Sequence, residues 1–299
     1  MRLILLALLA LMLCVPGERT YAQAGDRERT AFVTAVDARD EPIVDLAPGD
    51  VLVREDGVRR EVLRISRATE PMDIALLVDN SASAQRGITE LREGLLRFVT
   101  AMTTGDNANA GHQIAVVGLA DRPTILVDYT SDRRRLEDGI KRIFPMSTSG
   151  MTLLDALIET SRGLSRRNNV RAVIVPVIFD GVEFSNRYYR AVVDDIKEAG
   201  ASLQVVGIGT FGETGDSVIR ERELTLDAGT RETGGQRTSI LVPMALPTTL
   251  ERLARQLSSQ LKIVYSRPQS LIPPEKVEIS SARPGVTVRG TPMRGQPGA

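Results

Sequence analysis

Two apolar stretches of the sequence each end in an aspartate. IALLVD ends at Asp79, and AVIVPVIFD ends at Asp180. Two hydroxyl side chains, Ser81 and Ser83, follow the first aspartate at alternate positions, and Thr152 opens the helical pattern TLLDAL. Carboxylate and hydroxyl oxygens are the ligands of hard cations. The five side chains therefore indicate a site for a divalent ion, and three neutral hydroxyls with only two carboxylates favour Mg²⁺ over a Ca²⁺ cage.

The elements that carry these residues must bring them to one place. From Asp73 onward, apolar runs of strand length alternate with helical patterns, which indicates a mostly parallel sheet covered by helices. The carboxyl ends of parallel strands share one rim, where loops lead into helix N-termini and ligands bind. We therefore expect Asp79, Asp180 and the three hydroxyls on the same rim. An ion held there mainly by neutral oxygens would keep an open position for an anionic oxygen from outside.

The predicted fold class is α/β, a doubly wound and mostly parallel sheet with one antiparallel edge strand. The run PTILVDYT is the expected edge strand, because the connection Asp121-Arg122-Pro123 is too short for a crossover from QIAVVGLA. A small β domain made of the N- and C-terminal segments is expected to flank this unit. Its signals are short alternating runs between turn formers, in residues 30–66 and again in LKIVYSRP, KVEISS and VTVRG.

The expected chain organisation begins with a signal peptide. Arg2 precedes an apolar stretch from Leu3 to Val15, and Ala-Gln-Ala at residues 22–24 is a cleavage site. The stretch is shorter than the roughly 20 residues of a membrane-spanning helix, so no transmembrane anchor is expected after cleavage. The protein is predicted to be exported, either periplasmic or secreted. The expected units are the signal peptide (1–24), an N-terminal β segment (25–70), the α/β domain (71–265), a C-terminal β segment packing with the N-terminal one (266–290) and a disordered tail (291–299).

Composition narrows the classes of function. Lys and Arg together number 38, as do Asp and Glu, so no broad field favours nucleic acid or an anionic membrane as partner. The only cysteine, Cys14, lies in the predicted signal, and the bulky Leu13 before it disfavours lipidation. The mature chain is then expected to lack disulfides and thiolate metal sites.

Simpler interpretations exist for each candidate residue. Ser81 or Ser83 could cap the following helix, and Thr152 with Asp155 fits a capping box. Taken singly, each hydroxyl is more often a cap than a ligand, and the conjunction of all five residues is what favours the metal site. Glu183, in the loop of Asp180, is expected to be solvent-exposed. The segment TFGETGDS opens no clear apolar helix, so the preceding Gly-Ile-Gly is interpreted as an ordinary strand end.

Three stretches together resemble a known family. DIALLVDNSAS, TSGMTLLDAL and VIFDGVEFS are similar to the three loops of the metal-ion-dependent adhesion site of von Willebrand factor type A domains, over residues 71–265. The β region before them is similar to the N-terminal segment of a bacterial exported subgroup. The resemblance implies that a partner's Glu or Asp completes the metal shell. It also implies that the hydroxyls of Ser81, Ser83 and Thr152 coordinate the ion directly. The carboxylates of Asp79 and Asp180 would contact it largely through water.

The function expected from these observations is an exported, non-enzymatic protein-binding module that uses Mg²⁺, with Mn²⁺ or Ca²⁺ as possible replacements. Two alternatives stay open: a Mg²⁺-dependent hydrolase, and a structural assembly domain in which the metal is incidental. The hydrolase is disfavoured because no general base stands near the motif. The sole histidine, His112, precedes a strand and is expected at the opposite end from the rim.

Overall fold

The computed structural model describes residues 26–210, 216–268, 272, 274 and 276–292. The predicted signal peptide lies outside these residues, and so do residues 293–299 of the predicted tail. Residues 291 and 292, which were expected in the disordered tail, instead end strand β13 (Thr287–Pro292).

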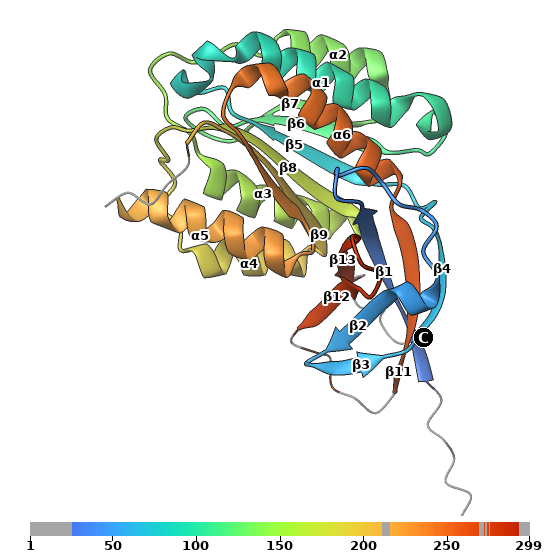
Figure 1. The fold of residues 1–299 in the computed structure, drawn as a ribbon. Helices are drawn as coiled ribbons and strands as arrows, with labels where there is room; N and C mark the ends of the chain where they lie inside the picture. The colour runs from blue at the N-terminus through green and yellow to red at the C-terminus, as the bar shows by residue number, and fades with distance from the viewer. Residues whose placement is uncertain (1–25, 211–215, 269–271, 273, 275, 293–299) are drawn as a thin grey trace, which may run out of the picture.

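Strands and helices alternate through the middle of the chain, and short strands lie at both ends (Figure 1). The other strands are β1 (Asp26–Val36), β2 (Val51–Glu55), β3 (Val58–Arg60), β4 (Val62–Arg67), β5 (Asp73–Val78), β6 (Gln113–Gly118), β7 (Thr124–Thr130), β8 (Ala172–Phe179), β9 (Ala201–Ile208), β10 (Gln236–Ile240), β11 (Leu261–Pro268) and β12 (Val277–Ser281). The helices are α1 (Ile88–Thr103), α2 (Arg133–Lys141), α3 (Leu153–Arg167), α4 (Tyr189–Glu198), α5 (Ser217–Glu232) and α6 (Leu246–Ser258), with short 3₁₀ helices η1 (Pro48–Asp50), η2 (Ala82–Arg86), η3 (Gly105–Asn107) and η4 (Pro243–Ala245).

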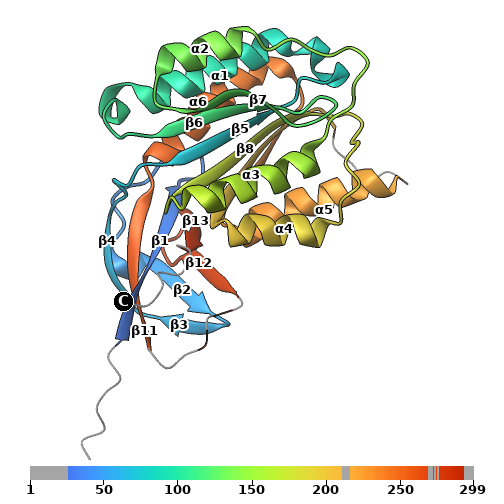
Figure 2. The ribbon, with the colours of Figure 1, turned by 180° about the vertical axis from the view of Figure 1, so that it is seen from behind.

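A six-stranded sheet forms the centre of the molecule, in the order β10-β9-β8-β5-β6-β7. The pairings β10–β9, β9–β8, β8–β5 and β5–β6 are parallel, and β6–β7 is antiparallel. Alternate residues of β5 point into two separate cores, one under α1, α2 and α6 and the other under α3, α4 and α5. The predicted α/β fold is confirmed in the form of helices packed on a mixed sheet (Figures 1 and 2).

The sequence pattern did not predict α5 and β10. Most buried residues of α5 are not large apolar side chains: they include Arg222, Thr225, Gly229 and Thr230, with Leu226 as the exception. A helix with so few apolar side chains on its buried face gives little periodic signal. Strand β10 lies at the sheet edge and reads QRTSI, which lacks the continuous apolar run of a central strand.

The segments at the two ends of the described chain pair with each other. One sheet has the order β13-β1-β11-β4 and another has the order β12-β2-β3. Their apolar residues form a third core, which includes Val33, Val53 and Ile263. Strand β11 crosses the predicted boundary at residue 265; it pairs along its length with β1 and from Leu261 to Tyr265 with β4. Because β4 leads into the amino end of β5 and α6 leads into β11, these strands lie at the opposite end of the central sheet from its carboxyl rim (Figure 1).

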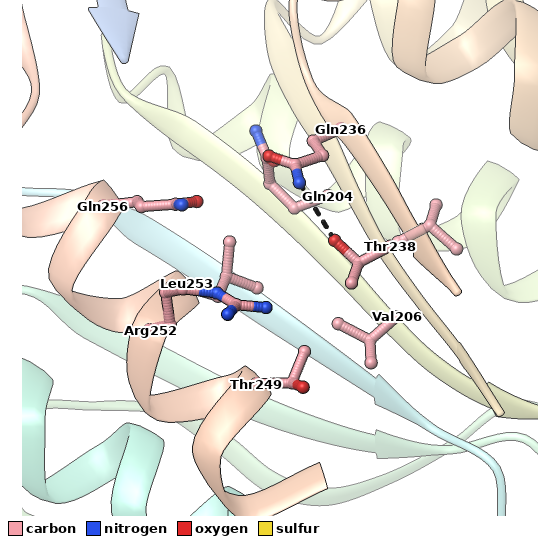
Figure 3. Close-up of a pocket in the computed structure, with 9 residues that line it drawn as sticks. Gln204, Val206, Gln236, Thr238, Thr249, Arg252, Leu253 and Gln256 are labelled. Atoms are coloured by element: carbon pink, nitrogen blue, oxygen red, sulfur yellow. Dashed lines mark hydrogen bonds between the residues drawn. The ribbon is translucent and has the colours of Figure 1, made fainter. Parts of the chain in front are cut away.

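Polar side chains line a small hollow between α6 and the β9–β10 edge of the sheet. Figure 3 shows Gln204, Gln236 and Thr238 facing α6, and Gln236 Nε2 donates to Thr238 Oγ1 at 3.1 Å. The volume of the hollow is ≈ 10 Å³, which is room for about one water molecule. Gln256 of α6 donates instead to the Asp40 carbonyl at 2.8 Å, so it ties the helix to the N-terminal strands. Among the described helices, none is long and apolar enough to cross a membrane.

His112 lies at the amino end of β6, away from the carboxyl rim. It is 6% exposed, and its Nδ1 accepts a hydrogen bond from the Met72 backbone N–H at 3.0 Å. Burial, with a smaller effect of the nearby Arg171 charge, lowers the pKa of His112 from 6.5 to about 4. The imidazole is therefore neutral in the folded protein, and it joins β5 to β6 as a structural acceptor.

This histidine should make stability depend on pH. Between pH 6.5 and about 4 the unfolded chain binds a proton at His112 that the folded protein does not bind. The contribution of His112 to stability is therefore complete above pH 6.5 and is lost as the pH falls to about 4, by about 3.5 kcal/mol at roughly 1.4 kcal/mol per pKa unit. His112→Gln keeps an acceptor that does not titrate. In urea unfolding, the free energy of unfolding of the variant should rise relative to that of the wild type as the pH is lowered from about 7 to about 4. A constant difference would contradict this assignment.

Candidate metal centre

Asp79 directly follows β5, and its carboxylate has no exposure to solvent. Its Oδ1 accepts from the Ser81 backbone N–H at 2.9 Å, and its Oδ2 accepts from the Phe179 N–H at 3.0 Å. Burial raises the pKa of Asp79, while the Ser81 hydroxyl, these two N–H groups and the charge of Arg222 favour the ionised form. The carboxylate thus joins the carboxyl end of β5 to that of β8.

The two serines of the first loop differ in their surroundings. Ser81 is buried, and its Oγ accepts from the Ser83 N–H at 3.4 Å, so it caps η2 as one of the simpler interpretations predicts. Ser83 is half-buried, and its Oγ lies against the Cα of Gly181. A Cβ at position 181 would stand 1.8 Å from that oxygen. The approach of Ser83 to the loop of Asp180 therefore requires a glycine.

Thr152 precedes α3, but its side chain does not cap the helix. The residue is 4% exposed, and its Oγ1 donates to the Leu119 carbonyl at 2.8 Å. The capping box with Asp155 is therefore wrong, and the Asp155 carboxylate instead accepts from Arg187 Nε at 2.5 Å. A hydroxyl that gives its proton to a carbonyl keeps its oxygen lone pairs for another partner. The Leu119 contact thus prepares Thr152 to accept or to coordinate.

Glu183 performs the capping that the sequence pattern assigned to Thr152. It is 4% exposed, so the expectation of a solvent-exposed glutamate is wrong. Its carboxylate accepts from the Leu153 N–H at 3.3 Å and from the Ser185 N–H at 2.9 Å. The Ser185 hydroxyl accepts from the Asp155 N–H at 3.1 Å, so two side chains of the β8 loop satisfy the first turn of α3. Burial raises the pKa of Glu183.

The loops that carry the five predicted residues meet at the carboxyl rim. Ala82 N–H donates to the Ser149 carbonyl at 3.2 Å, and Met151 N–H donates to the Val182 carbonyl at 2.9 Å. The segment before Thr152 is therefore bonded both to the loop of Ser81 and Ser83 and to the loop after Asp180. Asp180 itself is exposed, in contrast to Asp79. The five predicted residues thus comprise one buried carboxylate, one accessible carboxylate and three hydroxyls.

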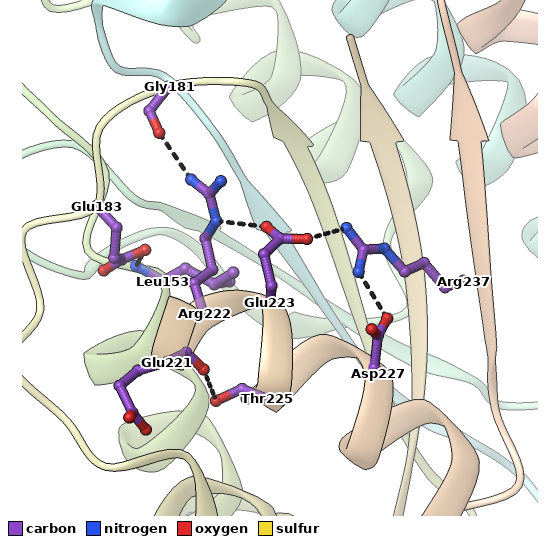
Figure 4. Close-up of polar contacts among 9 residues, drawn as sticks. All are labelled: Leu153, Gly181, Glu183, Glu221, Arg222, Glu223, Thr225, Asp227 and Arg237. Atoms are coloured by element: carbon purple, nitrogen blue, oxygen red, sulfur yellow. Dashed lines mark hydrogen bonds and ion pairs between the residues drawn. The ribbon is translucent and has the colours of Figure 1, made fainter. Parts of the chain in front are cut away.

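Arg222 is a component of this rim that the sequence pattern did not single out. It is 1% exposed, and its Nη1 donates to the Gly181 carbonyl at 2.7 Å (Figure 4). Its Nε pairs with Glu223 at 3.1 Å, and Glu223 pairs in turn with Arg237 at 2.5 Å. The charge of Arg222 opposes the rise in the pKa values of Asp79 and Glu183. In the sequence, Arg222 stands four residues before Leu226, and this spacing places the two side chains on the same face of a helix.

The donor set fits a divalent cation that accepts hydroxyl oxygens. Among the described residues, no group of three or more His, Cys, Asp or Glu side chains is placed to hold a metal. Thr152 adds a neutral oxygen whose lone pairs remain available, Ser83 adds a half-buried hydroxyl, and Asp180 adds an accessible carboxylate. A site with this composition suits Mg²⁺ better than zinc, which prefers histidine and cysteine.

Comparison with known proteins supports the fold. Residues 74–183 match the family model of the von Willebrand factor type A domain. A von Willebrand factor type A protein from Catenulispora acidiphila is 11% identical, covers 90% of this chain and 73% of its own, and has a TM-score of 0.51. Proximal thread matrix protein 1 from the mussel byssus is 17% identical, covers 72% of this chain and 50% of its own, and has a TM-score of 0.51.

These findings support a von Willebrand factor type A domain in this chain. At identities this low, the solved structures support the fold alone. The chain spans half the length of the mussel protein. No curated protein matches the sequence.

Removing the buried charge of Arg222 should destabilise the protein strongly. Arg222→Met removes the hydrogen bond to the Gly181 carbonyl, and it removes the cation near the buried carboxylates of Asp79 and Glu183. We expect a loss of about 3–5 kcal/mol, as for other buried ion pairs that lose one member. Arg220→Met, on the exposed face of the same helix, is the matched control and should change stability by less than about 0.5 kcal/mol. Equal losses in urea unfolding would show that Arg222 is not important for this loop.

Proposed function

We propose that this protein is an exported, non-enzymatic binding module that captures an acidic side chain of a protein partner through Mg²⁺ at the sheet rim. Ser81, Ser83 and Thr152 would hold the ion by their hydroxyls. Asp79 and Asp180 would act largely through bridging water. When bound, the ion supplies a positive charge with an open coordination position, which a Glu or Asp carboxylate of the partner fills.

The contact between Ser83 and Gly181 is the observation that carries this proposal. It brings the D-x-S-x-S loop against the loop of Asp180, where a Cβ would be 1.8 Å from the Ser83 oxygen. A helix cap would not require this approach, because Ser81 alone caps η2. The Thr152 hydroxyl supports the same proposal, since it is turned from its own helix to the Leu119 carbonyl.

Exposed apolar side chains around the rim support a protein as the partner. Three loops at this end of the sheet carry large hydrophobic residues that are at least 46% exposed: Phe144, Met146, Val182, Phe184, Tyr188, Leu241, Val242 and Met244. Met146 N–H donates to the Asn80 carbonyl, which places its loop beside the metal loop. Clusters of exposed apolar residues are typical of protein interaction surfaces. Exposed apolar residues around a bound cation would contact the surface of a folded partner while its carboxylate binds the cation.

The rest of the chain is consistent with this role. We infer that the signal peptide directs export. We also infer that residues 25–70 and 266–290 form an accessory β domain beside a doubly wound α/β domain. The terminal strands lie away from the carboxyl rim (Figure 2), so they leave it accessible. His112 is neutral and lies at the amino end of β6, so it supplies no catalytic base at the rim.

Metal binding can be tested with near-isosteric variants of two predicted ligands. Asp180→Asn and Thr152→Val should abolish the heat of Mg²⁺ binding in titration calorimetry. They should also abolish the stabilisation of the wild type, about 2.7 kcal/mol at about 100 times Kd. Asp121→Asn is the control, since Asp121 is an exposed aspartate at the same rim with φ 54°, which asparagine tolerates. If Asp180→Asn and wild type respond identically to Mg²⁺, the metal site is wrong.

Partner capture tests the second half of the proposal. The wild-type protein should retain a partner from the cell envelope with Mg²⁺ and release it with EDTA, whereas Asp180→Asn should retain none. Phe184→Ser and Met244→Ser should bind Mg²⁺ normally but lose the partner, because they remove only apolar contact area. Capture that persists in EDTA would instead favour a structural assembly domain. Turnover of phosphoesters that is lost in Asp180→Ala would favour the hydrolase.

A further inference from the structure

A second candidate binding site lies at the other end of the molecule, where the terminal strands meet the central domain. A groove of ≈ 1050 Å³ runs between strands β12 and β13 and the turn that connects α5 to β10. We propose that this groove binds an extended, acidic segment of a protein partner, which adds as a strand to the open edge of β12. The proposal is independent of the metal site.

The lining of the groove shows that it follows a strand edge. Each residue from Lys276 to Ser280 lines it. Successive side chains of a strand point to opposite faces, so a groove that contacts five consecutive residues cannot lie over one face. Within the described part of the chain, β12 pairs with β2 alone. The groove therefore reaches the edge of β12 that faces away from β2, and it also extends over the sheet face as far as Arg54 of β2.

The hydrogen bonds of β12 identify the backbone groups on this edge. The Lys276 carbonyl accepts from the Asp56 N–H at 2.9 Å, and the Ala282 N–H donates to the Asp50 carbonyl at 2.8 Å, both across to the β2 side. In an antiparallel pair, alternate residues direct both backbone groups to the same neighbour. The even-numbered residues thus face β2, and Val277, Ile279 and Ser281 direct their N–H and C=O groups to the open edge.

The opposite wall of the groove is held rigidly. Gly234, in the α5–β10 turn, has φ 66°, and a Cβ there would stand 1.8 Å from the Gly290 carbonyl oxygen of β13. The Ile279 side chain packs on Gly290, because its Cδ1 lies 2.7 Å from the position that a Cβ of Gly290 would take. These backbone contacts fix the turn against β13. A groove with fixed walls loses little entropy when a strand enters.

The charges of the lining select the occupant. Two cations are already paired, Lys197 with Glu232 at 3.0 Å and Lys276 with Glu278 at 2.5 Å. The other cationic residues that line the groove are Arg54, Arg231 and Arg289. Arg289 donates to Gln236 and lies near Asp40, and Arg54 lies near Glu278, so the described lining carries more cationic side chains than carboxylates. Strand addition supplies affinity through main-chain hydrogen bonds, and side-chain contacts supply selectivity. An excess of arginine beside an open edge therefore favours a strand that carries Asp or Glu.

A model peptide can test this site in the full-length protein. The probe is a fluorescein-labelled heptapeptide of alternating Thr and Glu, and the control is its Thr-Lys counterpart. The Glu peptide should raise fluorescence anisotropy and slow amide exchange at Val277 and Ile279, which should exchange fast in the free protein. EDTA and Asp180→Asn should not alter its binding, which separates this proposal from the metal-dependent one. Slow exchange at both amides before peptide is added would overturn the proposal.

Charge reversal supplies the matched comparison. Arg231→Glu should weaken binding of the Glu peptide at least about tenfold, a difference of about 1.4 kcal/mol. Arg220→Glu, exposed on the same helix but outside the groove, should leave it unchanged. Equal affinity of the Glu and Lys peptides, or equal effects of the two reversals, would show that the groove does not select an acidic strand. Absence of Glu-peptide binding at millimolar concentration would likewise overturn the proposal.

Discussion

The buried carboxylate of Asp79 is the constraint on which the rim depends. A carboxylate without exposure is costly unless hydrogen bonds replace water. Here two backbone N–H groups do so, one from Ser81 in its own loop and one from Phe179 on the neighbouring strand. These bonds fix where β5 and β8 end relative to each other. They consequently set the position from which Ser83 meets Gly181 and the loop of Asp180 begins.

The central strands were predictable because they are buried on both faces. Strands β5, β8 and β9 have no exposed residue, so their sequences are continuous apolar runs with clear ends. Asp79 and Asp180 could be assigned to one rim for the same reason. The ligand role of the five residues stays a prediction, whereas their placement on loops that meet is visible in the backbone hydrogen bonds.

The features that could not be predicted depend on contacts between distant segments. The capping box at Thr152 is locally plausible, but the Leu119 carbonyl, 33 residues away in sequence, takes its hydroxyl. Glu183 is buried only because its loop folds back over the N-terminus of α3. Arg222 occupies the buried face of α5, where its charge obscured the helical period. In each case a polar side chain exchanged its expected local role for a tertiary partner.

The chain of charges that starts at Arg222 connects the rim to the far edge of the sheet. Arg222 holds the Gly181 carbonyl, Glu223 joins Arg222 to Arg237 of β10, and Arg237 also pairs with Asp227 at 2.7 Å (Figure 4). A movement of the loop after Asp180 must therefore either break the hydrogen bond from Arg222 to the Gly181 carbonyl or carry α5 with it. Breaking a bond to a buried charge is expensive, so the loop and the helix are expected to act as one mechanical unit. Since the turn after α5 is also packed against β13 through Gly234 and Gly290, the same helix contacts both the rim and the groove beside β12.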